Sequence, residues 1–443
     1  MKQSNYNFFY RLDDGLLAYN ARTNAMAVVE QEKERELSRI LNGEESEDKK
    51  FVDELIYGGF LIADTTDELK NIRHDMYASR FSNRCLSLTI APTANCNFRC
   101  PYCYEKDVLH IQRMGDDTEE KLVNFVAHQL NSIEQLDVTW YGGEPLLEYP
   151  RILNLSQQFM KLCEEHKVIY SAGMVTNGYL LTKERLGELI KCRISSIQIT
   201  LDGMKETHDN RRYLRNHGGT FDRIMENLQS FEDLAKKKED FPQISIRINV
   251  DRSNSKQAFE LLEYIANLPL KSYVFPYVAD VYIPADVNYE NTLNGSEYEN
   301  LKEKFVKEAE KKGFLMGERA FYPQRVTSSC GCDQINTLVV DANGNLYKCW
   351  EEIGDTELCV GHLGEEQTYN LPQRYYDYML YDPTLDEKCS GCEILPVCMG
   401  GGCPIRRERD HRSDCRSRKE CFESNMRNSA ERFGKVIGER VAL

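Results

Sequence analysis

Residues 85–105, CLSLTIAPTANCNFRCPYCYE, place a short apolar run directly before a loop that holds three cysteines. The run has strand character, and further runs of the same kind follow it along the chain. These runs are LDVTWYG (136–142), VIYSAGMVTN (168–177), ISSIQITLDG (194–203), QISIRINVD (243–251) and SYVFPYVADVYI (272–283). Helical stretches such as EEKLVNFVAHQLNSI (119–133) and SKQAFELLEYIANL (255–268) lie between them. Strands that alternate with helices of this length predict βαβ units and a parallel sheet.

The number of repeats limits the kind of barrel that this sheet can form. Six strand–helix repeats are too few for a closed eight-stranded barrel, so we expect an α/β fold with a partial (β/α)6, TIM-like barrel. In such barrels the chemistry lies in the loops that follow the C-terminal ends of the strands. The three-cysteine loop follows the first strand directly, and we therefore expect it at that rim.

Composition and charge exclude several classes of function. The chain has 443 residues and a formal net charge of −15, which disfavours non-specific binding to a nucleic-acid backbone. No apolar run is long enough for a membrane span, and the N-terminal sequence is too polar for a secretory signal. These features predict a cytoplasmic protein without nucleic-acid or membrane partners.

Changes in pattern along the chain suggest four parts. Strands around the turns DDG (13–15) and NARTN (20–24), followed by amphipathic helical stretches at 32–43 and 49–62, predict a small α+β domain at the N-terminus. The last part is rich in Cys, Gly and Pro and has little hydrophobic periodicity, so metal ligation would have to hold it together. The predicted parts are the α+β domain at 1–80, the barrel at 81–282, a linker with a charged helix at 283–329 and the cysteine-rich domain at 330–443.

The distribution of the 16 cysteines favours metal binding over disulfides. The chain is long and has no export signal, whereas disulfide-rich chains are short and secreted. Three cysteines stand alone, and we expect them to be buried thiols: Cys85, Cys163 and Cys192. The others are clustered, as expected for metal ligands in a reducing compartment.

The first cluster of cysteines has the spacing CxxxCxxC, at Cys96, Cys100 and Cys103. Three thiolates satisfy three irons of a [4Fe–4S] cluster and leave the fourth iron without a protein ligand. A small molecule can then chelate the open iron. The alternative is zinc, but zinc sites usually have four ligands in paired CxxC units, and no fourth ligand lies nearby in the sequence.

This loop, with Tyr102 before its last cysteine, resembles the signature of the radical S-adenosylmethionine (SAM) superfamily. Later segments resemble further elements of that family in the same order: YGGEP at 141–145, VTNG at 175–178, and LDG at 201–203 followed by HDNRR. The resemblance implies a [4Fe–4S] cluster that binds SAM and converts it to a 5′-deoxyadenosyl radical, which removes a hydrogen atom from a substrate. It also implies a set of SAM-binding residues, namely Tyr102, Gly142, Gly143, Glu144, Thr176, Asn177 and Asp202.

The later cysteines resemble the SPASM domain, which carries auxiliary clusters. Gly344 and Cys349 fit its pattern, but the spacing from Cys398 to Cys403 is one residue longer than in the family, and the outer ligands are doubled. The resemblance implies two auxiliary [4Fe–4S] clusters, one on Cys330 and/or Cys332, Cys349 and Cys403, the other on Cys389, Cys392, Cys398 and either Cys415 or Cys421. A pair of zinc sites is the alternative, because CxxC is also a zinc motif. Cys359 fits no position.

Radical SAM enzymes with SPASM domains mostly modify peptides or proteins. The N-terminal part is similar to a small winged-helix module that binds leader peptides, although it could equally cover one end of the barrel. CWEEIG at 349–354 and the overall length resemble maturases of the sactipeptide and ranthipeptide group. This resemblance implies an enzyme that installs thioether crosslinks in a cysteine-containing, ribosomally synthesised precursor peptide and takes electrons from a flavodoxin or ferredoxin.

Three other functions remain open at this stage. They are an anaerobic sulfatase-maturing enzyme, a peptide carbon–carbon crosslinking or epimerising enzyme, and a non-enzymatic metal-binding scaffold. The scaffold is disfavoured because it gives no role to the GGEP and VTNG segments.

Overall fold

The computed structural model describes residues 1–13, 15–105, 112–237, 240–281, 291–314, 316, 322–365, 371–401 and 415–440. The chain divides into two compact units, which are described separately. The first unit holds Met1–Phe81, Gly317–Gln334 and Leu380–Leu443, and the second holds Ser82–Met316 and Ile335–Met379. The N-terminal part and the end of the cysteine-rich part therefore belong to one unit, although the sequence pattern assigns them to separate domains.

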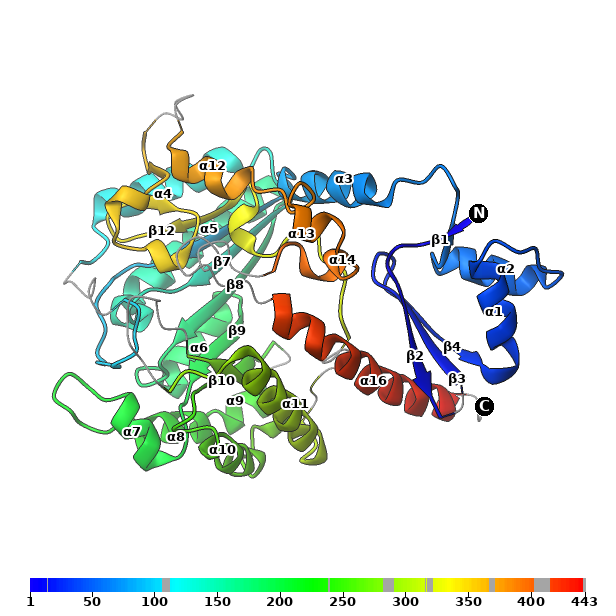
Figure 1. Ribbon diagram of the computed structural model, residues 1–443. Coiled ribbons are helices and arrows are strands. Elements are labelled where there is room, and N and C mark those ends of the chain that lie inside the picture. The colour runs from blue at the N-terminus through cyan, green and yellow to red at the C-terminus, as the bar shows by residue number, and fades with distance from the viewer. Residues whose placement is uncertain are drawn as a thin grey trace. The chain divides into compact units, whose positions relative to one another are not determined.

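The second unit is built on a parallel sheet, and the predicted partial (β/α)6 barrel is confirmed. Its strands follow the sheet order β11-β10-β9-β8-β7-β6, and every neighbouring pair among them is parallel. Figure 1 shows β7 to β10 side by side. The strands are β6 (Cys85–Ile90), β7 (Gln135–Trp140), β8 (Ile169–Thr176), β9 (Ile194–Thr200), β10 (Gln243–Val250) and β11 (Val274–Asp280).

Helices connect these strands, as the alternating pattern predicts. They are α4 (Asp116–Gln129), α5 (Tyr149–His166), α6 (Lys183–Lys191), α7 (Lys205–Arg211), α8 (Phe221–Ser230), α9 (Glu232–Lys237), α10 (Gln257–Ala266) and α11 (Gly295–Lys311). A further helix of this unit, α12 (Gln373–Met379), lies later in the chain. Short 3-10 turns are η2 (Pro145–Glu148), η3 (Lys271–Tyr273), η5 (Trp350–Glu352) and η6 (Thr356–Leu358). None of the helices described in either unit is both long and apolar enough to cross a membrane.

The two faces of the parallel strands differ in chemistry. In β6, Leu86, Leu88 and Ile90 are buried, whereas Ser87 and Thr89 between them are partly exposed. Successive side chains of a strand point to opposite faces, so one face is apolar and the other polar. The strands also contact their helices, as β8 does α5 and β9 does α6. The apolar face therefore supplies the core under the helices, and the polar face lines the inside of the partial barrel.

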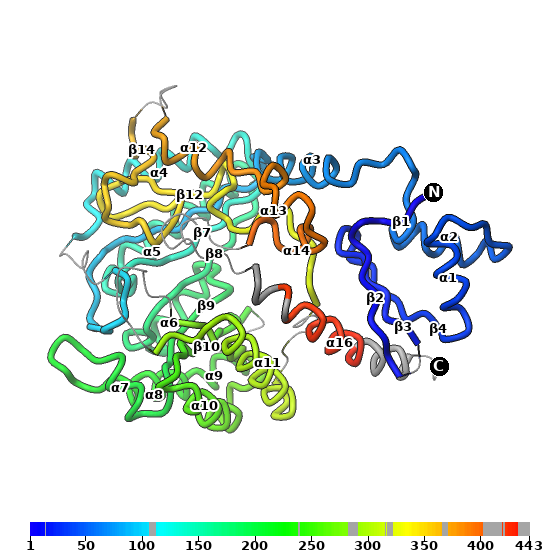
Figure 2. Tube along the Cα trace, in the orientation of Figure 1, coloured from blue at the N-terminus to red at the C-terminus, as the bar shows by residue number. Residues whose placement is uncertain are grey.

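Part of the cysteine-rich segment extends the same sheet. Strand β12 (Thr337–Val340) pairs parallel with β6, and β13 (Asn345–Tyr347) and β14 (Gly361–His362) continue it in antiparallel fashion. Figure 2 labels β12 and β14 on the yellow to orange part of the trace, far along the chain from β6. Val339, Tyr347 and Ile353 form an apolar cluster with Ala91. Part of residues 330–443 therefore packs its apolar side chains against an existing sheet, whereas the sequence pattern predicts that metal ligation holds this part together.

The first unit contains a three-stranded antiparallel sheet in the order β2-β3-β4. Its strands are β2 (Asn7–Leu12), β3 (Gly15–Asn20) and β4 (Ala25–Glu30), and β1 (Lys2–Gln3) pairs separately with β5 (Leu61–Ile62). The helices are α1 (Glu34–Leu41), α2 (Lys49–Tyr57), α3 (Glu68–Arg80), α13 (Glu387–Ser390), α14 (Leu395–Cys398) and α16 (Cys415–Arg440), with 3-10 turns η1 (Gln31–Lys33) and η4 (Gly331–Asp333). The predicted turn at 20–24 and a helix in each predicted helical stretch are present, whereas the predicted turn at 13–15 includes a residue outside the described ranges. The second stretch, predicted to be helical over 49–62, is helical only to Tyr57, and its last two residues form β5.

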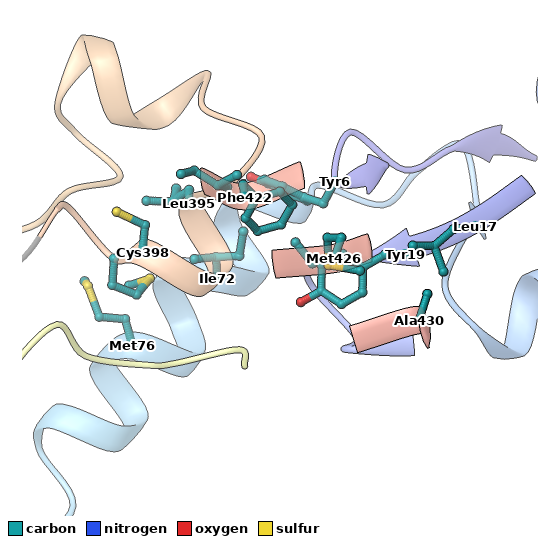
Figure 3. Packing of buried hydrophobic residues seen from close by; sticks show 13 residues of the cluster. Tyr6, Leu17, Tyr19, Ile72, Met76, Leu395, Cys398, Phe422, Met426 and Ala430 are labelled. Carbon is teal, nitrogen blue, oxygen red and sulfur yellow. The ribbon is translucent and has the colours of Figure 1, made fainter. Parts of the chain in front are cut away.

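Both faces of this small sheet are covered. Ala18 and Val29 pack with apolar residues of α1 and α2 on one face. On the other face, Leu17 and Tyr19 pack with Phe422 of α16 and with residues of α3 and α14 (Figure 3). The alternation of residues along β3 therefore divides the unit into two cores, and the second core joins the two ends of the chain.

Candidate active site

Residues predicted to bind one cluster and SAM follow the C-terminal ends of neighbouring strands in the second unit. The cysteine loop follows β6, Gly142 and Gly143 follow β7, Asn177 follows β8 and Asp202 follows β9. The strands are parallel, so these ends lie at one edge of the sheet. The structure thus brings the residues predicted from the cysteine loop and the three later motifs to one rim.

Two glycines allow the cysteine loop to approach the end of β7. Gly142 has a φ of +99°, and a Cβ at this position would lie 2.6 Å from the carbonyl oxygen of Thr93. At Gly143 a Cβ would lie 2.3 Å from the carbonyl oxygen of Asn95. The backbone N–H of Glu144 donates to that same Asn95 carbonyl at 2.9 Å. Only glycine leaves space for this contact, so the pair positions the loop directly.

Glu144 joins the ends of β7 and β8. Its side chain is fully buried. One carboxylate oxygen accepts hydrogen bonds from Thr176 Oγ1 at 2.7 Å and from Leu146 N at 3.0 Å, and the other accepts from Asn177 N at 2.8 Å. Burial raises the pKa of this carboxyl group, and these hydrogen bonds act in the opposite direction. Three residues predicted to contact one ligand therefore lie together, and Glu144 holds the other two in place.

Asn177 connects β8 to the first cysteine. Its Nδ2 donates to Asn97 Oδ1 at 2.8 Å and lies 4.0 Å from Cys96 Sγ. The backbone N–H of Phe98 also donates to that thiol, at 3.4 Å. The orientation of Cys96 is therefore determined by groups from two loops, one after β6 and one after β8.

A buried network of charges surrounds the middle of the cysteine loop. Tyr102 donates its hydroxyl to Asp202 Oδ2, which also accepts from Arg211 Nε at 3.0 Å. Arg211 Nη1 donates to Asp251 Oδ2 at 2.6 Å, and Arg212 Nη1 donates to Tyr102 Oη at 2.8 Å. The structure brings Tyr102 and Asp202 together as predicted. Arg211, Arg212 and Asp251 were missed, although the HDNRR segment that follows LDG pointed to this region.

The three thiols of the loop are poor nucleophiles as they stand. Burial raises the pKa of Cys96 and Cys100, and it raises the pKa of Cys103 to about 12. Negative neighbours add to the effect, such as Glu144 near Cys96 and Glu105 near Cys103. A metal centre provides the positive charge that a buried thiolate requires. The donor set, three thiolates from a single loop, fits an iron–sulfur cluster.

Within the described ranges, no three His, Cys, Asp or Glu side chains converge as closely as one metal ion requires. A four-iron cluster is larger than one metal ion, so its cysteine ligands lie farther apart than the ligands of a single ion. The absence of a single-ion site among the described residues is therefore compatible with an iron–sulfur cluster on these cysteines.

Several buried polar atoms near the loop make no hydrogen bond within the described part of the chain. A buried polar atom without a partner costs free energy, and each such atom in a native structure needs an explanation. A ligand with both amino-acid and ribose groups fits this mixture of donors and acceptors. The atoms are Asn97 Nδ2, Glu105 Oε1, Asp202 Oδ1, Arg211 Nη2 and Arg212 Nε.

The cysteines predicted to hold auxiliary clusters are distributed over both units. In the first unit, Cys330 and Cys332 are hydrogen-bonded to each other, and this hydrogen bond lowers the pKa of Cys330 to about 6. Cys389, Cys392 and Cys398 all lie in or against the hydrophobic cluster of Figure 3. Each of these two groups holds cysteines that the resemblance assigns to the same cluster, and both groups lie within the first unit.

The remaining ligands are less fully described. Cys349 belongs to the second unit, and Cys421 lies half-buried on α16. Cys403 and the side chain of Cys415 lie outside the described residues. The auxiliary clusters and their ligand sets remain predictions.

The isolated cysteines differ in burial. Cys163 and Cys192 are buried, as predicted. Cys85 is only half-buried, because it lies on the polar face of β6 and donates to Asp137 Oδ2 at 3.3 Å. Its predicted burial is therefore wrong. Cys359 donates its thiol to the carbonyl of Gly361 at 2.8 Å.

Comparisons with known proteins agree with this geometry. The profile of the Radical SAM superfamily matches residues 90–269. A cysteine-type anaerobic sulfatase-maturating enzyme of Clostridium novyi is 25% identical over 378 residues, which cover 77% of this chain and 95% of that protein.

Two solved structures share the fold. The structure of anSMEcpe with bound AdoMet has a TM-score of 0.61 at 20% identity and covers 78% of this chain and 98% of its own. Streptococcus suis SuiB bound to the precursor peptide SuiA has a TM-score of 0.54 at 16% identity and covers 91% and 95%.

Proposed function

This chain is an enzyme of the radical SAM superfamily with its radical SAM domain at residues 90–269, and we propose that it installs thioether crosslinks in a ribosomally synthesised precursor peptide. The observation that carries the proposal is the combination of two features in one chain. A rim of strand ends holds three buried thiols and unpaired polar atoms, and a separate small sheet has an edge that can bind a peptide.

In this proposal Cys96, Cys100 and Cys103 hold a [4Fe–4S] cluster. When bound, the cluster and SAM together supply the radical that removes a hydrogen atom from the substrate. Gly142 and Gly143 keep the cysteine loop close to the end of β7.

The residues around the loop would bind SAM and keep it in place. The backbone at Gly143 and Glu144 faces the loop, and Thr176 and Asn177 are held by the Glu144 carboxylate. Tyr102 and Asp202 would contribute through the pair that their hydrogen bond forms. The unpaired Asn97 Nδ2, Asp202 Oδ1 and Arg212 Nε provide donors and an acceptor for the polar groups of SAM.

The small sheet of the first unit supports a peptide substrate. Within the described residues, β4 pairs with β3 alone and is an edge strand, on which Val28 is 54% exposed. An extended peptide can add to such an edge through main-chain hydrogen bonds. SuiB, whose structure was determined with its precursor peptide, matches 91% of this chain, whereas anSMEcpe matches 78%. The larger match favours a precursor peptide whose leader binds at this sheet.

Two further cofactor and partner assignments belong to this proposal. The cysteines of the second half of the chain would hold two auxiliary clusters, one of which could bind a peptide thiolate or accept the electron left after thioether formation. A flavodoxin or ferredoxin would supply the electron for SAM cleavage.

Sulfatase maturation is the second candidate function. The relative from Clostridium novyi favours it, because the similarity extends over 95% of that enzyme. Peptide carbon–carbon crosslinking and epimerisation use the same radical and differ only in the fate of the substrate.

Mass spectrometry of the product separates these candidates. The enzyme is reconstituted anaerobically and tested for 5′-deoxyadenosine, then co-expressed with a cysteine-containing candidate peptide. Thioether formation removes two hydrogen atoms per crosslink and blocks alkylation of the peptide cysteine. Aldehyde formation on a sulfatase peptide, or solvent deuterium at an α-carbon without loss of mass, supports the other candidates instead. A variant lacking Cys96, Cys100 and Cys103 that still releases deoxyadenosine at the normal rate contradicts the whole assignment.

A further inference from the structure

Arg212 is a buried cation that contacts the cysteine loop. It follows α7, and only 9% of its surface is exposed. Its Nη1 donates to Tyr102 Oη at 2.8 Å, and its guanidinium carbon lies 5.8 Å from the centroid of the Phe98 ring. An arginine keeps its charge at any ordinary pH, so this site always contains a positive charge.

The two aromatic contacts of Arg212 flank one cysteine. Phe98 precedes Cys100 by two residues, and Tyr102 follows it by two. One guanidinium thus holds the loop on both sides of the middle thiol.

The neighbouring Arg211 shows what is unusual about Arg212. Arg211 is paired with two fully buried carboxylates, those of Asp202 and Asp251, at 3.0 and 2.6 Å. Over the residues that the structure describes, Arg212 has no carboxylate within ion-pair distance, and its Nε makes no hydrogen bond. Arg211 is therefore compensated by direct ion pairs, whereas Arg212 is hydrogen-bonded to Tyr102 of the cysteine loop and interacts with the carboxylates of Asp202 and Glu144 only through space.

We propose that Arg212 positions the cysteine loop and is the fixed positive charge that raises the reduction potential of the cluster held by Cys100. This inference rests on the proposed cluster at Cys96, Cys100 and Cys103. Reduction adds one electron, supplied by the external donor, and the protein takes up no proton in this step. A nearby cation in a medium of low dielectric stabilises the more negative state. Arg212 therefore makes the first electron transfer easier through its charge.

The test compares Arg212→Gln and Arg212→Lys with the wild type and with a matched control. The control is Arg185→Gln, because Arg185 also lies over an aromatic ring, that of Tyr149 at 4.8 Å, and donates to backbone carbonyls away from the cysteines. Each protein is reconstituted anaerobically without SAM, its iron content is measured, and the cluster is titrated under EPR at controlled potentials.

At the potential where the wild-type cluster is half reduced, the Gln variant should have a ratio of reduced to oxidised cluster roughly tenfold lower. The Lys variant should lie close to the wild type, because it keeps the charge, and the Arg185 control should be unchanged. A fully loaded Gln variant with the wild-type potential overturns the proposal.

If the Gln variant does not take up iron, the Lys variant decides. Iron uptake restored by Lys supports the proposal, and equally poor uptake by both variants overturns it, since the charge then has no part. Failure of the proposed function is distinguishable, because the wild-type protein would then show neither a [4Fe–4S] signal nor deoxyadenosine formation.

Discussion

Replacing Gly143 by alanine should displace the cysteine loop while leaving the fold intact. An added methyl carbon would lie 2.3 Å from the carbonyl oxygen of Asn95, 2.6 Å from its carbonyl carbon and 2.7 Å from the carbonyl oxygen of Ala94. Ordinary contacts begin at 3.4 Å. All three atoms belong to the backbone, so no side-chain rotation relieves the overlap. The loop must therefore move by about 1 Å relative to the end of β7.

The expected effect on activity is much larger than the effect on stability. Overpacking of this kind costs about 1–3 kcal/mol of unfolding free energy. A displacement of about 1 Å in a reactive centre can lower the rate about 100-fold. We therefore expect deoxyadenosine formation by Gly143→Ala to fall about 100-fold, with a folded protein and an otherwise normal far-UV spectrum.

The assay measures deoxyadenosine under dithionite together with iron content and thermal unfolding. Gly187→Ala is the matched control, because Gly187 lies in α6 and a Cβ there has no neighbour within 4 Å. Alanine is preferred over glycine inside a helix by about 0.5–1 kcal/mol, so this variant should be fully active and slightly more stable. A Gly143→Ala enzyme with iron content and rate both within about twofold of the wild type would refute the reasoning.

Three further changes test other contacts. Glu144→Gln replaces one carboxylate oxygen by an NH2 group, which faces N–H and O–H donors that now donate to Glu144. The change should lower the unfolding free energy by about 1–3 kcal/mol, measured by denaturant titration. An unchanged midpoint would contradict this geometry. Burial and nearby arginines lower the pKa of His208 well below 6.5, so the unfolded chain binds a proton that the folded chain does not, and stability should decline as the pH falls below 6.5. His208→Gln should remove part of that decline, and an identical pH dependence in both proteins would contradict the assignment. Met426→Ala should cost about 2–5 kcal/mol and expose the N-terminal sheet to proteolysis, because Met426 is fully buried in the shared core. Tyr57→Ala, at a residue 94% exposed, should leave proteolysis unchanged, and equal cleavage of both variants would show that the shared core has no such role.

The sequence alone determined the parallel sheet and the location of the reactive rim. Apolar runs alternating with amphipathic helices predict this topology because each strand must be buried on the helix side. The spacing of Cys96, Cys100 and Cys103 predicts the first metal site from the sequence alone, since ligands within one loop need no tertiary information to be brought together. Motifs at strand ends, such as Glu144, were also located correctly, because the ends of parallel strands meet at one edge.

Contacts between segments distant in the sequence were decided only by the tertiary structure. No local pattern connects Tyr19 of β3 with Phe422 of α16, yet the two lie in one core that joins the ends of the chain. Nor does the sequence indicate that Arg211 is neutralised by Asp251, 40 residues away, while Arg212 is left to face the cysteine loop. Local patterns reflect the burial of one face of a strand or helix. Which charges become neighbours depends on how those faces pack, and that is settled by the whole chain at once.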